Sequence, residues 1–289
     1  TAAASAATAR SPAKGPPMLW TRIASGVVLG PVFLLLIFHG HPAFHVMIAI
    51  ITAIITWEFV RMDSQLGFGA RRVLIAAGVL GAILIPFAAP YAMFIVALSM
   101  LGLLLKRGDP IYLAPSYAVL PAVALAYLWA AGGAHRLDRQ IMAPWGSAID
   151  GGAFTVLWVV IIVWATDIGA YAFGRMIGGP KLAPAISPGK TRSGGVGGLV
   201  CAVAFSALLL WLFKVHIKPS HVIVAFLISV ISQAGDLFES ALKRRYGIKD
   251  SGGLIPGHGG FMDRFDGLWA AAPIAAVFCV ILGGGVQRW

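Results

Sequence analysis

The sequence predicts an all-α, polytopic membrane protein with about nine transmembrane helices, and three observations support this. First, 59% of the 289 residues are hydrophobic and only 11% are charged, which gives a mean hydropathy of +0.86. Second, apolar runs of ~20 residues, the length that crosses a bilayer, recur along the whole chain. Third, the sequence has no long polar stretch that would form a separate soluble domain.

The expected membrane segments follow from hydrophobicity and length. They cover residues 23–38, 43–60, 73–88, 91–105, 117–131, 154–173, 194–215, 221–238 and 268–282. Some are shorter than the ~20 residues that span a bilayer, which implies tilted neighbours or local thinning. The third to fifth segments depend on whether Pro86 or Pro90 lies within a broken helix.

The distribution of basic residues predicts the orientation. With the N-terminus inside, 17 of the 22 Lys and Arg residues fall in inside segments. Cytoplasmic loops of membrane proteins carry such an excess, so we expect the N-terminus inside and the C-terminus outside. The same bias explains the net charge of +11, and we therefore predict no nucleic-acid partner.

Acids and glycines divide the chain into unequal parts. Residues 1–17 are small, polar and basic, and we interpret them as a disordered tail or an expression remnant. Residues 18–150 form a transmembrane scaffold in which Glu58 is the only acid within the segments up to residue 131, and residues 151–289 form the catalytic region. Cys201 and Cys279 lie inside apolar segments, which favours buried small hydrophobes over metal ligands.

Residues 232–266 form the expected reaction centre, because they hold five of the eleven acids of the chain. Charge at a membrane edge costs free energy and tends to mark function. Asp236 shares one helical face with Glu239 and Ser240, and Lys243 and Arg244 are expected to extend that face into the cytosol. A structural ion pair is the alternative role for Asp236.

The run GHGGFMDRFDG suggests phosphate and metal binding. Glycines around His258 allow close approach of a ligand to backbone N–H groups, so the loop suits an anion. Carboxylates such as Asp263, next to phosphate-binding bases, are a usual way to hold Mg²⁺. Asp266 suits either a direct role or an N-cap of the last segment, and His258 suits either a ligand contact or a structural role in the loop.

A third polar region joins Asp167 to the loop at 178–198. The loop ends in Gly189-Lys190-Thr191, but Pro184 stands where a P-loop needs its first glycine, so we reject a P-loop. Its basic, hydroxyl and glycine residues still suit a triphosphate or a lipid phosphate. An ordinary positive-inside loop is the alternative, and the GGVGG run at 194–198 is also explained by close helix packing.

These residues together resemble the signature of the phosphatidate cytidylyltransferase (CDP-diacylglycerol synthase) family. The resemblance rests on Ser240, Lys243, Arg244, Lys249, Asp250, Pro256, His258, Gly260, Asp263, Arg264 and Asp266, and further on Asp167, Tyr171, Ser187, Pro188, Lys190, Thr191, Gly235 and Asp236. It is sharp from about residue 154 to 273. Three positions depart from the family pattern: Gly189 replaces a lysine, Ser193 a glutamate and Gly267 a serine.

The resemblance implies a Mg²⁺-dependent reaction of CTP with phosphatidate that gives CDP-diacylglycerol and pyrophosphate. It also implies a homodimer in the bacterial inner membrane with its site facing the cytoplasm. Asp236 and Asp263 would hold Mg²⁺, with a second cation (K⁺) nearby. The residues expected in catalysis are Asp236, Asp263, Lys243, Arg244, Lys249, Arg264 and His258, and those expected to bind substrate are Ser187, Lys190, Thr191, Arg192, Ser240, Asp167, Asp250 and Asp266.

Three alternatives remain open from the sequence. One is the same chemistry on a polyprenyl or archaeal lipid phosphate. The second is a transporter that uses intramembrane Asp167 and Asp236, although transporters often show internal repeats and place acids near the midplane, and this sequence shows no convincing repeat. The third is a scaffold protein without catalytic activity.

Overall fold

A computed structural model describes residues 19–40, 42–85, 97–98, 101–102, 105, 108–132, 140–144, 148–255 and 259–289. The helices are α1 (Leu19–His39), α2 (Ala43–Arg61), α3 (Phe68–Leu84), α5 (Ala114–Gly132), α6 (Gly151–Met176), α7 (Arg192–Leu212), α8 (Pro219–Arg245) and α9 (Met262–Ile281), with short 3₁₀ turns η1 (Pro110–Leu113) and η2 (Val286–Arg288). Two small hairpins pair β1 (Gln140–Met142) with β2 (Ala148–Asp150), and β3 (Lys181–Ala183) with β4 (Ser187–Thr191). The predominantly helical fold is confirmed.

Six of the described helices are long and apolar enough to cross a membrane. They lie at Ala43–Arg61, Pro110–Gly132, Gly151–Met176, Arg192–Leu212, Pro219–Arg245 and Met262–Ile281, and a shorter apolar stretch covers Val28–His39 within α1. The expected segment 73–88 corresponds to α3, which at 17 residues is not one of the six. The expected segment 91–105 lies mostly outside the described residues.

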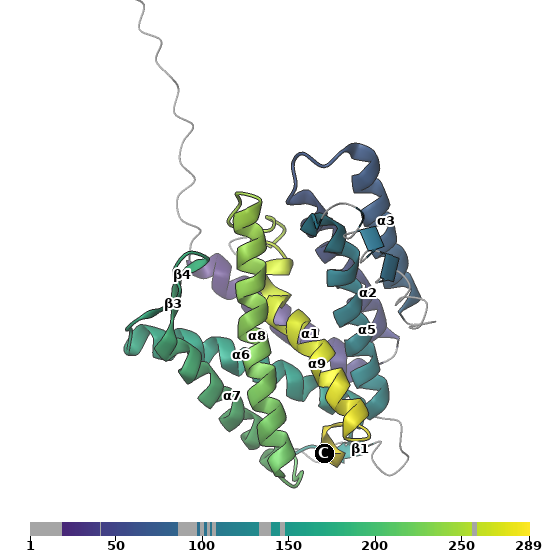
Figure 1. The fold of residues 1–289 in the computed structure, drawn as a ribbon. Helices are drawn as coiled ribbons and strands as arrows, with labels where there is room; N and C mark the ends of the chain where they lie inside the picture. Colours follow the sequence, from purple (N-terminus) through teal and green to yellow (C-terminus); the bar gives the residue numbers. More distant parts are fainter. Residues whose placement is uncertain are drawn as a thin grey trace, which may run out of the picture.

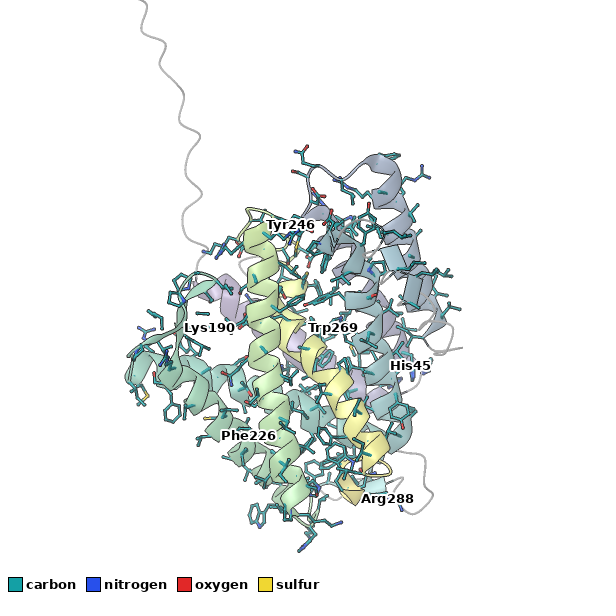
Figure 2. All side chains as sticks on the ribbon, in the orientation of Figure 1. His45, Lys190, Phe226, Tyr246, Trp269 and Arg288 are labelled. Atoms are coloured by element: carbon teal, nitrogen blue, oxygen red, sulfur yellow. The ribbon has the colours of Figure 1, made fainter. Side chains whose placement is uncertain are left out.

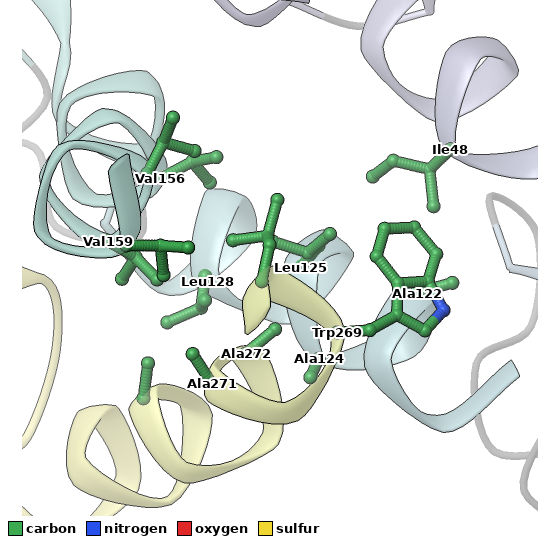
Figure 3. Close-up of a cluster of buried hydrophobic side chains, with 14 of the residues drawn as sticks. Ile48, Ala122, Ala124, Leu125, Leu128, Val156, Val159, Trp269, Ala271 and Ala272 are labelled. Atoms are coloured by element: carbon green, nitrogen blue, oxygen red, sulfur yellow. The ribbon is translucent and has the colours of Figure 1, made fainter. Parts of the chain in front are cut away.

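The helices form two groups around a central pair. In Figure 1, α2, α3 and α5 stand together on one side of α8 and α9, while α6 and α7 pack together on the other. The apolar core joins the groups: Leu125 and Leu128 of α5 face Val156 and Val159 of α6 (Figure 3). Trp269 of α9, which is 1% exposed, fills the same core.

Glycines allow α6 and α7 to approach closely. A Cβ at Gly169 would lie 2.7 Å from the Cys201 side chain, and one at Gly198 would lie 2.8 Å from the Thr166 carbonyl oxygen. Backbones therefore touch where the GGVGG run meets α6, as small residues at helix interfaces permit. This confirms the packing role suggested for that run.

The last two long helices extend further toward the polar region than the hydrophobic pattern predicts. The segment expected at 221–238 is α8, which continues to Arg245, and the segment expected at 268–282 begins at Met262. Hydropathy misses these turns because they carry charge. As a result Asp236, Glu239, Lys243 and Asp263 all project from helices.

Candidate active site

The last turns of α8 and the first turn of α9 are joined by a buried network around Asp263. Lys243 Nζ donates to Asp263 Oδ1 at 2.5 Å and to Glu239 Oε1 at 3.0 Å. The Glu239 side chain is fully buried and that of Lys243 is 13% exposed. Lys243 therefore does not extend into the cytosol as predicted, because the two carboxylates turn it inward between the helices.

The second oxygen of Asp263 organises the loop before α9. Asp263 Oδ2 accepts from Gly260 N at 2.8 Å and from Ser251 N and Ser251 Oγ, both at 3.0 Å. These N–H groups belong to the preceding loop, outside α9, and the carboxylate supplies their acceptor. Asp263 is thus held on both oxygens, by a lysine and by the loop.

Glu58 of α2 completes the same region from the other half of the chain. Its Oε1 accepts from Phe261 N at 3.0 Å, and its Oε2 accepts from Met262 N at 2.8 Å and from Ser251 Oγ at 3.3 Å. The Glu58 side chain is fully buried. A glutamate 203 residues away in sequence therefore caps α9, and the N-cap role considered for Asp266 is wrong because Asp266 lies inside the helix.

A second ion pair links the β3–β4 hairpin to α8. Lys190 Nζ contacts Asp236 Oδ2, and the two side chains are 26% and 34% exposed. Lys190 lies on the hairpin at one side of α8 (Figure 2). The basic loop and the acidic helix face, which are separate motifs in the sequence, thus meet in one site.

Three carboxylates on different helices influence one another electrostatically. Asp236 of α8 acts electrostatically on Asp167 of α6 and on Asp266 of α9, and Asp167 also acts on Asp266. Lys190 and Arg264 oppose this charge at Asp167. The arrangement favours binding of additional positive charge.

The loop before α7 is held mainly by its own polar groups. Thr191 Oγ1 accepts from Gly194 N at 3.1 Å and so caps α7, and it lies 3.1 Å from Ser193 Oγ. Ser193 donates to the Gly178 carbonyl oxygen. Ser187 pairs with Ala183 in the hairpin. A Cβ at Gly189, the first position that departs from the family pattern, would meet no atom within 4 Å.

The remaining predicted residues have simpler surroundings. Arg244 is exposed and donates to the Ile248 carbonyl oxygen at 3.1 Å, while Arg192, Lys249, Asp250 and Arg264 are exposed and Ser240 is partly buried. His258 lies outside the described residues. Within the described ranges, no three His, Cys, Asp or Glu side chains are arranged to hold a metal ion, and the two expected metal ligands, Asp236 and Asp263, pair with different lysines.

Tyr246, directly after α8, adds a polar contact that was not predicted. Its hydroxyl donates to Asp109 Oδ1 at 3.1 Å. Burial, together with the Asp109 carboxylate, raises the pKa of the Tyr246 phenol above its ordinary value. This bond ties the end of α8 to the turn before α5.

Glu58 and Ser251 are the site residues that sequence reasoning missed. The signal for Glu58 was present, since it is the only acid in the predicted membrane segments up to residue 131, and an ionisable residue inside an apolar segment is a functional candidate by default. Ser251 had no such signal. Its role depends on the fold of the loop.

Comparison with known proteins points to one family. The model of the cytidylyltransferase family matches residues 20–282. A phosphatidate cytidylyltransferase of Brucella suis biovar 1 (strain 1330) is 49% identical over 130 residues, which are 45% of this chain and 48% of the relative. One from Staphylococcus haemolyticus (strain JCSC1435) is 40% identical over 130 residues, 45% of this chain and 50% of the relative. The aligned part thus spans about half the length of these curated relatives.

Proposed function

Because the chain belongs to the cytidylyltransferase family, we propose that it transfers a cytidylyl group from CTP to phosphatidate and releases pyrophosphate. The relatives that match it are named phosphatidate cytidylyltransferases. Two ion pairs, Lys190–Asp236 and Lys243–Asp263, are the observation that carries the proposal. They join residues of the family resemblance from the β3–β4 hairpin, α8 and α9.

The chemistry requires charge neutralisation and positioning more than a protein nucleophile. A phosphatidate oxygen attacks the α-phosphorus of CTP, a new P–O bond forms, and the bond to the β-phosphate breaks, so that pyrophosphate leaves. Both substrates are anions, and such transfers depend mainly on orientation and on electrostatic stabilisation. We assign stabilisation of the leaving phosphates to Lys243, Arg244, Lys249 and Arg264, and phosphate binding to the 187–192 loop.

We include Mg²⁺ in this proposal as an ion that binds together with the substrate phosphates. Asp167, Asp236 and Asp266 repel one another, and carboxylate oxygens are the ligands that Mg²⁺ shares with substrate phosphates. When bound, Mg²⁺ neutralises charge on the CTP phosphates. Asp236 would hold the ion through the carboxylate oxygen that does not contact Lys190. Asp263 would hold it only after its hydrogen bond to Lys243 or Ser251 is broken. A second cation, K⁺, would be held by the neighbouring carboxylates.

We also propose a placement in the cell. The orientation rule places the β3–β4 hairpin and the end of α8 on the cytoplasmic side of a bacterial inner membrane, where CTP is available. We further propose nine membrane spans, with the N-terminus inside and the C-terminus outside. We also propose a homodimer.

Product formation by the purified protein tests this function. CTP and Mg²⁺ are supplied with phosphatidate, with a polyprenyl phosphate, or with no lipid, and lipid products are identified by mass spectrometry. We expect CDP-diacylglycerol with phosphatidate only. A cytidylylated polyprenyl product would keep the chemistry and change the substrate. No nucleotide transfer to any lipid, with uptake of a solute into vesicles, would favour the transporter alternative.

A further inference from the structure

The turn between α2 and α3 carries more positive than negative charge. Arg61 ends α2, and Arg71 and Arg72 lie in the first turns of α3. Arg71 closes the turn by donating to the Asp63 carbonyl oxygen at 3.1 Å, while the Asp63 side chain accepts from Gln65 N at 2.8 Å. Among the described residues, neither Arg61 nor Arg72 forms an ion pair with an acid, and both are exposed. These two arginines therefore have charge available for a partner.

Arg61 and Arg72 each lie against an aromatic ring of their own helix. The guanidinium carbon of Arg61 lies 4.4 Å from the ring centroid of Trp57, and that of Arg72 lies 5.4 Å from the ring centroid of Phe68. Both distances are within the ~6 Å over which a cation is attracted to a ring face. A guanidinium on a ring keeps N–H donors at its edge, and this fork matches the oxygens of a phosphate. The two rings thus hold both arginines in position to bind a phosphate.

The charge on α3 stands at the end of a face that suits lipid. By their spacing, one face of the helix carries Phe68, Arg72, Val73, Leu80 and Ile83. Its four apolar side chains are 75%, 67%, 52% and 54% exposed. A continuous exposed apolar face marks contact with a membrane, and aromatic and basic side chains at the end of such a face lie at the level of the lipid headgroups. An arginine in an ordinary aqueous loop has no such face beside it.

The turn lies at the same end of the molecule as the candidate site but on other elements. Figure 1 shows the α2–α3 turn and the last turns of α8 at the same end of the helices, and Asp63 acts electrostatically on Tyr246. The phosphate-binding residues proposed above lie on or beside the β3–β4 hairpin, α8 and α9. A partner bound by Arg61 and Arg72 would therefore use residues that the proposed reaction does not use.

We propose that the end of α2 and the start of α3 bind the phosphate of an anionic phospholipid of the surrounding bilayer. This headgroup site consists of Arg61, Trp57, Arg72 and Phe68. The phosphate accepts from the two guanidiniums while the acyl chains lie along the exposed face of α3, which a soluble anion would leave uncovered. Because Arg61 follows Glu58 by one turn of α2, and Glu58 accepts from the backbone at the start of α9, bound lipid also stabilises the helix end that caps α9.

Lipid binding is measured on the full-length protein with two phospholipids. Phosphatidylglycerol carries one negative charge, whereas the choline of phosphatidylcholine offsets that charge. Each lipid is titrated into the detergent-purified protein, and bound lipid is counted by native mass spectrometry. We expect phosphatidylglycerol to bind more tightly, with an affinity that falls as salt is added, because salt screens exposed charges. Equal affinities for the two lipids at low salt would overturn the proposal.

Two variants and a matched control locate the binding. Arg61→Gln and Arg72→Gln should each lower the affinity for phosphatidylglycerol about fivefold, the size expected for one arginine at an anionic membrane surface. Arg245→Gln removes an arginine at the end of α8 and should leave the affinity unchanged. All three positions are exposed, so each variant should keep the wild-type unfolding midpoint in phosphatidylcholine. An equal loss in all three variants, or no loss in the first two, would show that binding follows net charge alone and would refute the site.

Photo-crosslinking separates the headgroup site from the candidate active site. Phosphatidylglycerol with a photoreactive headgroup is irradiated with the protein in phosphatidylcholine vesicles, and labelled peptides are mapped. We expect labels between residues 57 and 73 that unlabelled phosphatidylglycerol removes and that inorganic phosphate does not. Labels only on the 187–192 loop, α8 or α9 would assign the lipid to the reacting phosphates. Labels that inorganic phosphate removes would assign the site to a soluble anion, and crosslinks between two copies through α3 would assign the face to an oligomer; each of these results would overturn the proposal.

Discussion

At the scale of single residues, the central feature is a carboxylate from α2 that holds the start of α9. Glu58 accepts from the backbone N–H of Phe261, just before α9, from that of Met262, its first residue, and from the hydroxyl of Ser251. Removing a buried acceptor leaves its donors unsatisfied, at a cost of about 1–3 kcal/mol per group. Because Ser251 also bonds to Asp263, the two acids share a partner, and we expect Glu58 to position Asp263.

Substitution of Glu58 tests this positioning role. We expect Glu58→Ala to lower the thermal unfolding midpoint and kcat strongly, with a smaller change in KM for CTP. Glu58→Gln keeps one carbonyl acceptor, so it should retain more of both stability and kcat. The comparison uses thermal unfolding in detergent together with steady-state kinetics. Equal behaviour of the alanine and glutamine variants would contradict the role of the acceptor.

Lys243 provides a second test at this scale. It is the cation that contacts the fully buried Glu239, and breaking a buried pair by removing one partner costs about 3–5 kcal/mol. Lys243→Met should therefore destabilise the protein strongly, and Lys243→Met combined with Glu239→Gln should recover part of the stability without recovering activity, because Asp263 still lacks its lysine. Arg245→Met, at an exposed position two residues on, is the control and should stay near wild-type stability.

At the scale of elements, the site depends on how closely α8 and α9 approach. A Cβ at Gly235 would overlap the Ala270 side chain and lie 3.0 Å from the Asp266 carbonyl oxygen. A Cβ at Gly267 would lie 2.5 Å from Ser232 Oγ. These two glycines let the helices touch where Asp236 and Asp266 project. The serine common in the family at position 267 would need Ser232 to move.

Glycine-to-alanine substitutions measure this contact. Gly235→Ala should destabilise the protein by about 1–3 kcal/mol, the usual cost of overpacking, and should lower activity because α8 and α9 separate. Gly69→Ala in α3 is the control, since its Cβ would meet nothing within 4 Å and alanine favours a helix. If Gly235→Ala were as stable and active as Gly69→Ala, close packing would not support the site.

The helices that are most apolar were the easiest to predict from the sequence. The segments at 43–60 and 154–173 correspond to α2 and α6, because hydrophobic length is a strong signal. The hydrophobic pattern did not predict the first turns of α9, because these turns contain charged residues. The group that caps the helix comes from α2, which is distant in sequence. The two hairpins were missed as well, since strands of three to five residues carry little pattern.

At the scale of the whole molecule, α8 connects two ends that we expect on opposite sides of the membrane. It has 27 residues, about 40 Å at ~1.5 Å per residue, which exceeds the ~30 Å hydrocarbon core. Its C-terminal half meets the β3–β4 hairpin through Asp236 and Lys190. Lys218, directly before α8, meets the chain end, where its Nζ donates to the Arg288 carbonyl oxygen at 3.2 Å. In Figure 1 the C-terminus lies beside β1.

Accessibility labelling tests the orientation. In a background with Cys201 and Cys279 replaced by serine, we introduce single cysteines by Lys181→Cys, Arg245→Cys and His216→Cys. Lys181→Cys and Arg245→Cys should react with a membrane-impermeant maleimide only in inverted vesicles, and His216→Cys only in right-side-out vesicles. Labelling of the first two from opposite sides would refute the topology.

The candidate site was predictable in its chemistry but not in its connections. The motif residues Lys190, Asp236 and Asp263 were identified from sequence, because charged groups stand out in apolar surroundings. Their partners were not identified, because contacts between distant segments depend on helix packing. The division into a scaffold at 18–150 and a catalytic region at 151–289 stays a prediction, and Glu58 shows that the two parts share the loop before α9.

The most direct measurement is pyrophosphate release by the purified protein with CTP, phosphatidate and Mg²⁺, beside Asp263→Asn and the control Asp63→Asn. Asp63 accepts a hydrogen bond from Gln65 N in the turn after α2. The account predicts release that needs all three components, is retained in Asp63→Asn and is lost in Asp263→Asn. Release that persists in Asp263→Asn, or that occurs without phosphatidate, would contradict it.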